Sequence, residues 1–147
     1  MVNRRDREIS EESSYHCAIC GNTLPYEPAL PRYDAPCSEC GYHLWCRQLA
    51  PRDVTELEVL PRRTPEPWDV DQLVKALVHR NAHARVVIDL HRLDIIDSAF
   101  VARLLSLNKL VHAAGGRLVL RGLCPLIQET FDHLRLNQAF EMDLSDR

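Results

Sequence analysis

Four cysteines near the amino terminus are the residues with the clearest capacity for chemistry. They form two Cys-x-x-Cys pairs separated by sixteen residues, namely Cys17, Cys20, Cys37 and Cys40. Two thiolates three positions apart can turn back onto one metal ion, and two such pairs complete a tetrahedron of four sulfurs. Four thiolates leave no open position for water. The spacing therefore predicts a structural zinc ion that folds the segment around it.

A glycine follows the second cysteine of each pair, Gly21 and Gly41. Glycine there allows a positive φ that aims backbone N–H groups at the sulfurs. Residues 15–50, rich in proline and poor in helical periodicity, resemble a zinc ribbon, with Tyr42–Trp45 as the strand after the second turn. His16, His43 and Cys46 lie close enough in sequence to be alternative ligands, but the paired cysteines already satisfy a zinc ion. The alternative is two unrelated pairs, reduced or redox-active.

Composition limits the class of protein. The chain of 147 residues is 46% hydrophobic with a net charge of −3, so it can bury a core but has no excess of Lys and Arg to neutralise phosphates. No apolar run approaches the roughly 20 residues that span a bilayer. Residues 1–14 are charged, which predicts a flexible tail and not a signal peptide. We expect a cytoplasmic protein that binds neither membrane nor nucleic acid.

Strand and helix patterns alternate through residues 51–147, which we expect to form a second domain. Apolar runs predict strands at 54–60, 85–90 and 117–121, and apolar stripes predict helices from Asp69 or Asp71 to Arg80, over 98–113 and from Pro125 onward. Leu126, Ile127, Phe131 and Leu134 are expected to line the inner face of the last helix. Such alternation is typical of an α/β fold whose parallel strands are joined by crossover helices.

A strand ending in Asp89-Leu90 leads to Asp97-Ser98, then to the helix over 98–113 and to Gly115-Gly116. This arrangement resembles the STAS domain of anti-sigma factor antagonists, over about residues 54–142. The resemblance implies a small, mostly parallel sheet with crossover helices, a regulatory and not an enzymatic function, and a partner that is an anti-sigma-type serine kinase. It also implies that Ser98 is the phosphorylated residue.

The predicted switch has a simple physical basis. A phosphate adds about −1.5 to −2 charges at the start of the helix, beside Asp94 and Asp97. Repulsion and bulk would then weaken a partner docked there. The expected docking face comprises the loop 94–98 and the first turns of the helix, including Phe100 and Arg103.

Three other interpretations remain open. Asp97-Ser98 is also a favourable helix cap, and Ala99-Phe100 stands where the STAS family has a small residue and a glycine, which favours a scaffold that does not switch. The zinc ribbon would bind nucleic acid or polymerase in a second interpretation, and Ser98 with His91 would form a hydrolase in a third. One clear strand, not two, precedes the first helix, and an edge strand is compatible with a homodimer.

Overall fold

The computed structural model describes residues 15–24, 36–49, 54–61, 64–80 and 85–143. The predicted flexible tail at residues 1–14 lies outside these described residues. None of the helices described here has the length and apolar character needed to cross a membrane.

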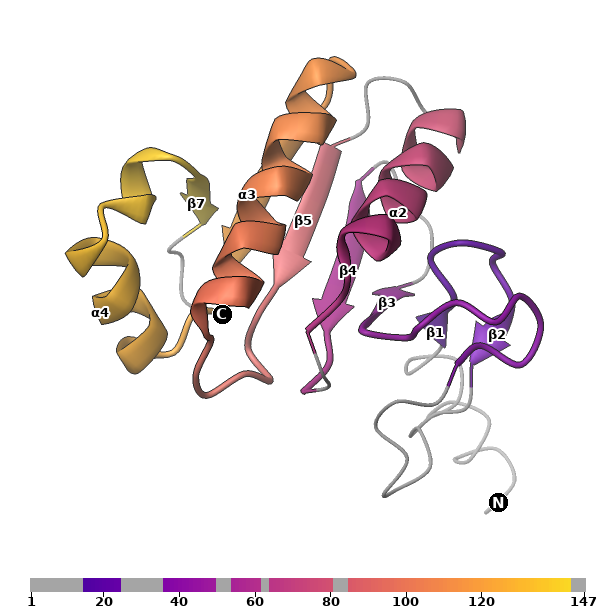
Figure 1. The fold of residues 1–147 in the computed structure, drawn as a ribbon, viewed down its shortest axis with the longest axis horizontal. Helices are drawn as coiled ribbons and strands as arrows, with labels where there is room; N and C mark the ends of the chain where they lie inside the picture. Colours follow the sequence, from indigo (N-terminus) through magenta and orange to yellow (C-terminus); the bar gives the residue numbers. More distant parts are fainter. Residues whose placement is uncertain (1–14, 25–35, 50–53, 62–63, 81–84, 144–147) are drawn as a thin grey trace, which may run out of the picture.

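A single mixed sheet organises the described part of the chain (Figure 1). Its seven strands follow the order β2-β1-β3-β4-β5-β6-β7. The bounds are Tyr15–His16 (β1), Thr23–Leu24 (β2), Cys46–Leu49 (β3), Thr55–Val59 (β4), Arg85–Asp89 (β5), Arg117–Arg121 (β6) and Glu141–Asp143 (β7). Strands β4 to β7 pair in parallel, whereas β1, β2 and β3 pair antiparallel with their neighbours. The mostly parallel α/β fold predicted from the sequence is confirmed.

Three helices follow the parallel strands: α2 (Pro67–Arg80), α3 (Ser98–Ala113) and α4 (Pro125–His133), with a short 3-10 helix, η1, at Leu136–Gln138. Figure 1 shows α2 and α3 side by side on one face of the sheet, with their first turns near the carboxyl ends of β4 and β5. The predicted bounds of α3 are confirmed. This helix ends before Gly115, whose φ of 86° is readily accessible only to glycine.

The core lies between the sheet and these helices. Alternate residues of β5 and β6 face inward, such as Val86 and Ile88 of β5, while Leu73 and Leu104 approach from the helices. Each fully buried side chain of this size stabilises the fold by about 1.5–3 kcal/mol. In α4 only Ile127 and Phe131 are buried. The prediction that Leu126 and Leu134 also face inward is wrong, since they are 55% and 58% exposed: a short helix at the edge of the sheet buries one narrow stripe.

The sequence revealed one strand before the first helix, and strand β3 is a further strand there that it did not reveal. It pairs antiparallel with β4, matching Cys46 with Val59. The predicted strand at Tyr42–Trp45 is reduced to one β-bridge between His43 and Pro36, because the Trp45 N–H donates to the carbonyl of His43 at 2.9 Å and bends the chain there. The strand can begin only after this bend. The cysteine segment, which is residues 15–24 and 36–49, thus contributes strands to the same sheet, and the boundary expected at residue 50 falls between two paired strands.

Candidate functional site

The four paired cysteines meet in space. Their sulfur atoms all lie within 4.8 Å of one another, and the Cys17–Cys40 and Cys20–Cys37 distances are both 3.7 Å. A tetrahedron with Zn–S bonds of about 2.3 Å has edges of about 3.8 Å. The separations match that figure and are far longer than the roughly 2.05 Å of a disulfide. The donor set therefore fits a tetrahedral zinc ion.

The two cysteine turns have the same conformation. Gly21 and Gly41 have φ values of 80° and 79°, as the sequence predicted. Their N–H groups donate to the carbonyl oxygens of Cys17 and Cys37 at 2.9 and 2.8 Å. The Glu39 N–H points at the Cys37 sulfur, 3.4 Å away. Each turn thus presents two sulfurs on the same side, as a shared ion requires.

The thiols differ in their affinity for protons. Burial raises the pKa of Cys17 to about 12. Burial acts in the same direction on Cys37, but hydrogen bonds from the backbone of Cys40 and Glu39 outweigh it and lower the pKa of Cys37 to about 7. A bound cation is what would hold all four sulfurs as thiolates at neutral pH.

Two of the predicted bystanders lie outside this cluster. The His43 ring is directed to the Asp69 carboxylate, at 3.5 Å, and Cys46 is buried in the core. Burial raises the pKa of the Cys46 thiol well above its usual range. Both residues support packing between the cysteine segment and the helices.

The cysteine segment is attached to helix α2 at both of that helix's ends. The Tyr42 hydroxyl donates to the carbonyl oxygen of Asp69, in the first turn of α2, at 2.7 Å. At the last turn, the Arg80 guanidinium donates to the carbonyl oxygen of Ala18 and to Gln48. The segment is therefore fixed against the α/β layers.

At the start of α3, the structure separates the roles of Asp97 and Ser98. Asp97 is the cap: its backbone is extended, and its Oδ1 accepts a hydrogen bond from the Phe100 N–H at 2.8 Å. Ser98 is the first helical residue and is exposed, as are Asp94 and Ile95. Capping thus occupies the carboxylate of Asp97 and leaves the hydroxyl of Ser98 accessible from solvent.

Phe100 and Arg103, which we expected on the docking face, are placed differently. Phe100 is 6% exposed and meets the Trp45 ring edge to face, with centroids 6.4 Å apart. Its position at the third residue of α3 turns the ring toward the core. Arg103 is half-buried and donates from Nε to the carbonyl oxygen of Pro65 at 2.9 Å.

An apolar cavity lies between the cysteine segment and the start of α3. Its volume is about 160 Å³, and its walls include Trp45, Leu60, Ile95, Asp97 and Phe100. Phe100 therefore faces this cavity from beneath the surface. The exposed loop and the cavity adjoin each other through Ile95, which is 71% exposed.

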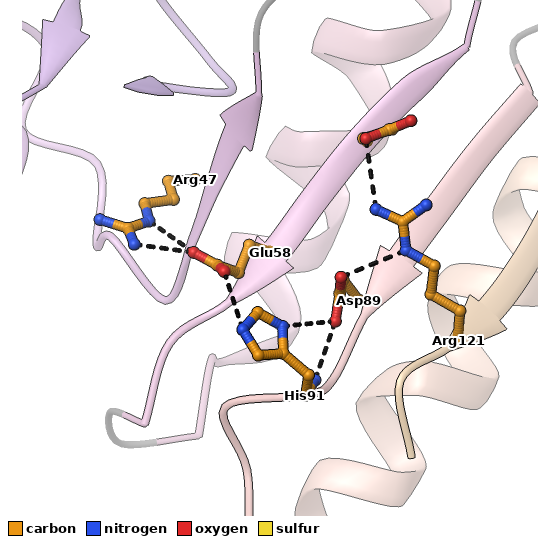
Figure 2. A network of polar contacts seen from close by, with 6 residues as sticks. Arg47, Glu58, Asp89, His91 and Arg121 are labelled. Atoms are coloured by element: carbon orange, nitrogen blue, oxygen red, sulfur yellow. Dashed lines mark hydrogen bonds and ion pairs between the residues drawn. The ribbon is translucent and has the colours of Figure 1, made fainter. Parts of the chain in front are cut away.

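A network of charged side chains lies on the face of the sheet opposite to helices α2 and α3 (Figure 2). Arg47 pairs with Glu58 at 2.8 Å, and His91 lies between Glu58 and Asp89, at 3.4 and 2.8 Å. Arg121 completes the network by donating to Asp89 at 3.2 Å. Both ring nitrogens of His91 face carboxylates, so the ring is not arranged as a base for Ser98. Sequence reasoning missed this network, although Asp89 and Arg121 end neighbouring strands.

The network sets the ionisation of Asp89. Burial raises the pKa of this carboxyl, but hydrogen bonds from the backbone and ring of His91, and from Arg121, outweigh burial and lower the pKa below its usual 3.8. A lowered pKa in the folded state means that the charged form contributes stability above the unfolded pKa. That contribution disappears as the pH falls through the lower, folded pKa.

Replacing Asp89 by asparagine is expected to show this dependence. At about pH 7 the variant should be less stable than the original protein by about 1–3 kcal/mol, because Arg121 and His91 lose a charged partner. The gap should narrow across a series of pH values from 3.8 downward, as the pH falls through the lower, folded pKa and Asp89 itself becomes protonated. Urea unfolding of both proteins at each pH measures the gap. A gap that does not change with pH would contradict the assignment.

The family follows from comparison with known proteins. A family model described as "Mlab, STAS domain" matches residues 67–144, more than half of the chain. A STAS domain protein from Planctomyces limnophilus, described as an anti-sigma-factor antagonist, has a similar structure, with a TM-score of 0.52 and 18% identity over 69% of this chain and 91% of that one. A variant of RsbS from Moorella thermoacetica has a TM-score of 0.53 and 21% identity over 67% and 88%. No curated protein matches the chain. Because the family model covers residues from α2 to β7, the chain belongs to the STAS domain family.

Proposed function

We propose that this chain is a regulatory protein-binding module of the anti-sigma factor antagonist type, switched by phosphorylation of Ser98. STAS domains typically bind proteins such as kinases and anti-sigma factors, and are generally regulators without enzymatic activity. The observation that carries the proposal is that Ser98, whose side chain ends in a hydroxyl, is an exposed residue at the first position of a helix capped by another residue, Asp97. A modifying enzyme can reach this hydroxyl without breaking the cap.

The docking surface consists of the exposed residues Asp94, Ile95, Asp97 and Ser98. Ile95 supplies apolar area, and the two carboxylates supply negative charge close to Ser98. A phosphate on Ser98 would raise this local charge by about −1.5 to −2. A partner that had buried Ile95 would then have to desolvate three anionic groups, which favours dissociation. The partner in this proposal is an anti-sigma-type serine kinase in the cytoplasm.

The cysteine cluster holds a structural Zn²⁺ in this proposal. Cys17, Cys20, Cys37 and Cys40 would be its four ligands. When bound, the ion supplies the cross-link that a short loop-rich segment needs to fold.

Replacing Ser98 by aspartate tests the switch. We expect the variant to bind the purified partner kinase at least about tenfold more weakly than the original protein, because the added charge repels the docked surface. Ser98→Ala should bind normally and should gain no phosphate when incubated with the kinase and ATP. Isothermal titration measures the first result, and intact mass measures the second.

Ser106→Asp is the matched control, since Ser106 is exposed on the same helix but two turns away. It should bind like the original protein. Equal binding by the Ser98→Asp and Ser106→Asp variants would overturn the switch.

A second candidate is a docking module of the same fold that does not switch. The apolar cavity walled by Trp45 and Phe100 favours it, because an apolar group could be held there regardless of the state of Ser98. Partner binding that tolerates Ser98→Asp but is lost on Ile95→Asp would establish this candidate instead.

A further inference from the structure

A continuous set of contacts joins the second cysteine turn to the cap of helix α3. The Cys37 N–H donates to the Tyr42 carbonyl oxygen at 2.8 Å, which closes the turn. The Tyr42 hydroxyl then accepts a hydrogen bond from Trp45 Nε1 at 2.8 Å. The Trp45 ring rests on Phe100, and the N–H of Phe100 is the group that Asp97 caps. The start of α3 is thus packed on side chains that the cysteine turn positions.

The packing side chains are all buried. Tyr42 is 3% exposed, Trp45 is 2% exposed and Phe100 is 6% exposed. Two of them come from the stretch between the second cysteine turn and β3, where the strand-like pairing is a single β-bridge between His43 and Pro36. A loop of this kind owes its order to whatever fixes its ends. Here β3 fixes one end, and the cysteine cluster fixes the other.

The first cysteine turn makes a hydrogen bond of its own to α2. Its carbonyl at Ala18 accepts from Arg80, at the opposite end of α2 from Asp69. Loss of order in the cluster would therefore reach the start of α3 through the second turn, by way of Tyr42 and Trp45.

We propose that metal occupancy of the cysteine cluster regulates the docking surface at the start of α3. With Zn²⁺ bound, Tyr42 holds Trp45 against Phe100, and the capped first turn keeps Ser98 in its docking position. Without the ion, Trp45 leaves Phe100, the cavity between them opens, and the first turn of α3 frays. This regulation rests on the proposed docking function, but it makes a physical claim that can be measured without any partner.

Hydrogen exchange of the full chain, zinc-loaded or stripped with a chelator under reducing conditions, tests the coupling. Stripping should speed exchange at residues 36–49, and also at the Phe100 and Val101 amides by at least about tenfold. Amides of β6 (Arg117–Arg121) should exchange unchanged. Faster exchange confined to the cysteine segment would overturn the proposal, and so would an equal increase throughout the chain.

Variants of the connecting residue sharpen the test. Trp45→Phe removes the hydrogen bond to Tyr42 but keeps a ring against Phe100, so it should bind one Zn²⁺ and show a smaller effect of stripping at Phe100. Arg80→Ala is the control, since it breaks the contact with the first turn and should leave the effect at Phe100 intact. The route through Trp45 would be overturned if zinc removal had a smaller effect on exchange at Phe100 in Arg80→Ala than in Trp45→Phe. Failure here would leave the Ser98 proposal standing, because that proposal is tested by partner binding alone.

Discussion

Replacing Cys37 by serine is expected to abolish zinc binding and to lower the free energy of unfolding by several kcal/mol. Cys37 is 2% exposed, and its sulfur lies 3.7 Å from that of Cys20. A serine hydroxyl at this position supplies no thiolate. Structural zinc contributes roughly 10–16 kcal/mol of apparent binding free energy in small finger peptides, so the loss of one ligand in four removes much stabilisation. Native mass spectrometry and urea unfolding measure the two effects.

Cys124→Ser is the matched control. This thiol is half-buried at the start of α4, and its contact with the Asp94 carbonyl oxygen, at 3.5 Å, lies outside the cluster. The variant should retain one zinc ion and should be about as stable as the original protein. Chelation should destabilise the original protein and Cys124→Ser, but should leave Cys37→Ser unchanged. Equal zinc content in the two variants would refute the four-cysteine site.

Local patterns in the sequence predicted those parts of the molecule that depend on neighbouring residues. The cysteine spacing and the following glycines predicted two like turns, because each turn is closed within six residues. The bounds of α3 followed from its apolar stripe, the Asp97-Ser98 start and the glycine end. The same local signals could not assign the cap to Asp97 over Ser98, since both side chains suit that position.

Other features depend on pairings between distant residues. Strand β3 is recognisable only beside β4, because its sequence, Cys46–Leu49, includes two polar residues that are buried. One of them, Arg47, is accommodated by Glu58, eleven positions away. Phe100 was expected on the docking face, but it shares the buried stripe of α3 with Leu104, Leu107 and Val111, and its ring meets Trp45 from the cysteine segment. The stripe signals that Phe100 faces inward, but no local pattern identifies Trp45 as its neighbour.

Gly122 is another residue whose role depends on distant residues, and its replacement is the second change for which we expect a large loss of stability. It follows β6 with a φ of 76°, a conformation that costs an alanine about 1–2 kcal/mol. A Cβ at Gly122 would also lie 2.6 Å from Asp89 Oδ1 and 3.1 Å from the His91 backbone nitrogen. Gly122→Ala should therefore displace Asp89 from His91 and Arg121, and lower the free energy of unfolding by roughly 3 kcal/mol or more.

Gly21→Ala is the control that separates the cost of the backbone conformation from the cost of the steric clash at Gly122. Gly21 has a φ of 80°, but a Cβ there would meet nothing within 4 Å. In zinc-loaded protein this variant should lose only the cost of the backbone conformation, which is less than the loss in Gly122→Ala. Equal losses would mean that the network tolerates the methyl group.

A double-mutant cycle tests whether the part of the Gly122→Ala loss that exceeds the cost of the backbone conformation comes from Asp89. Asp89→Ala removes the oxygen that the new Cβ would meet, so Gly122→Ala should cost less in the Asp89→Ala background than in the original protein. The contacts of the new Cβ with His91, at 3.1 Å, would remain, and recovery should be partial. Urea unfolding of the four proteins measures the coupling. Additive losses would show that Gly122 is required by its backbone conformation and its contacts with His91, and not by the carboxylate of Asp89.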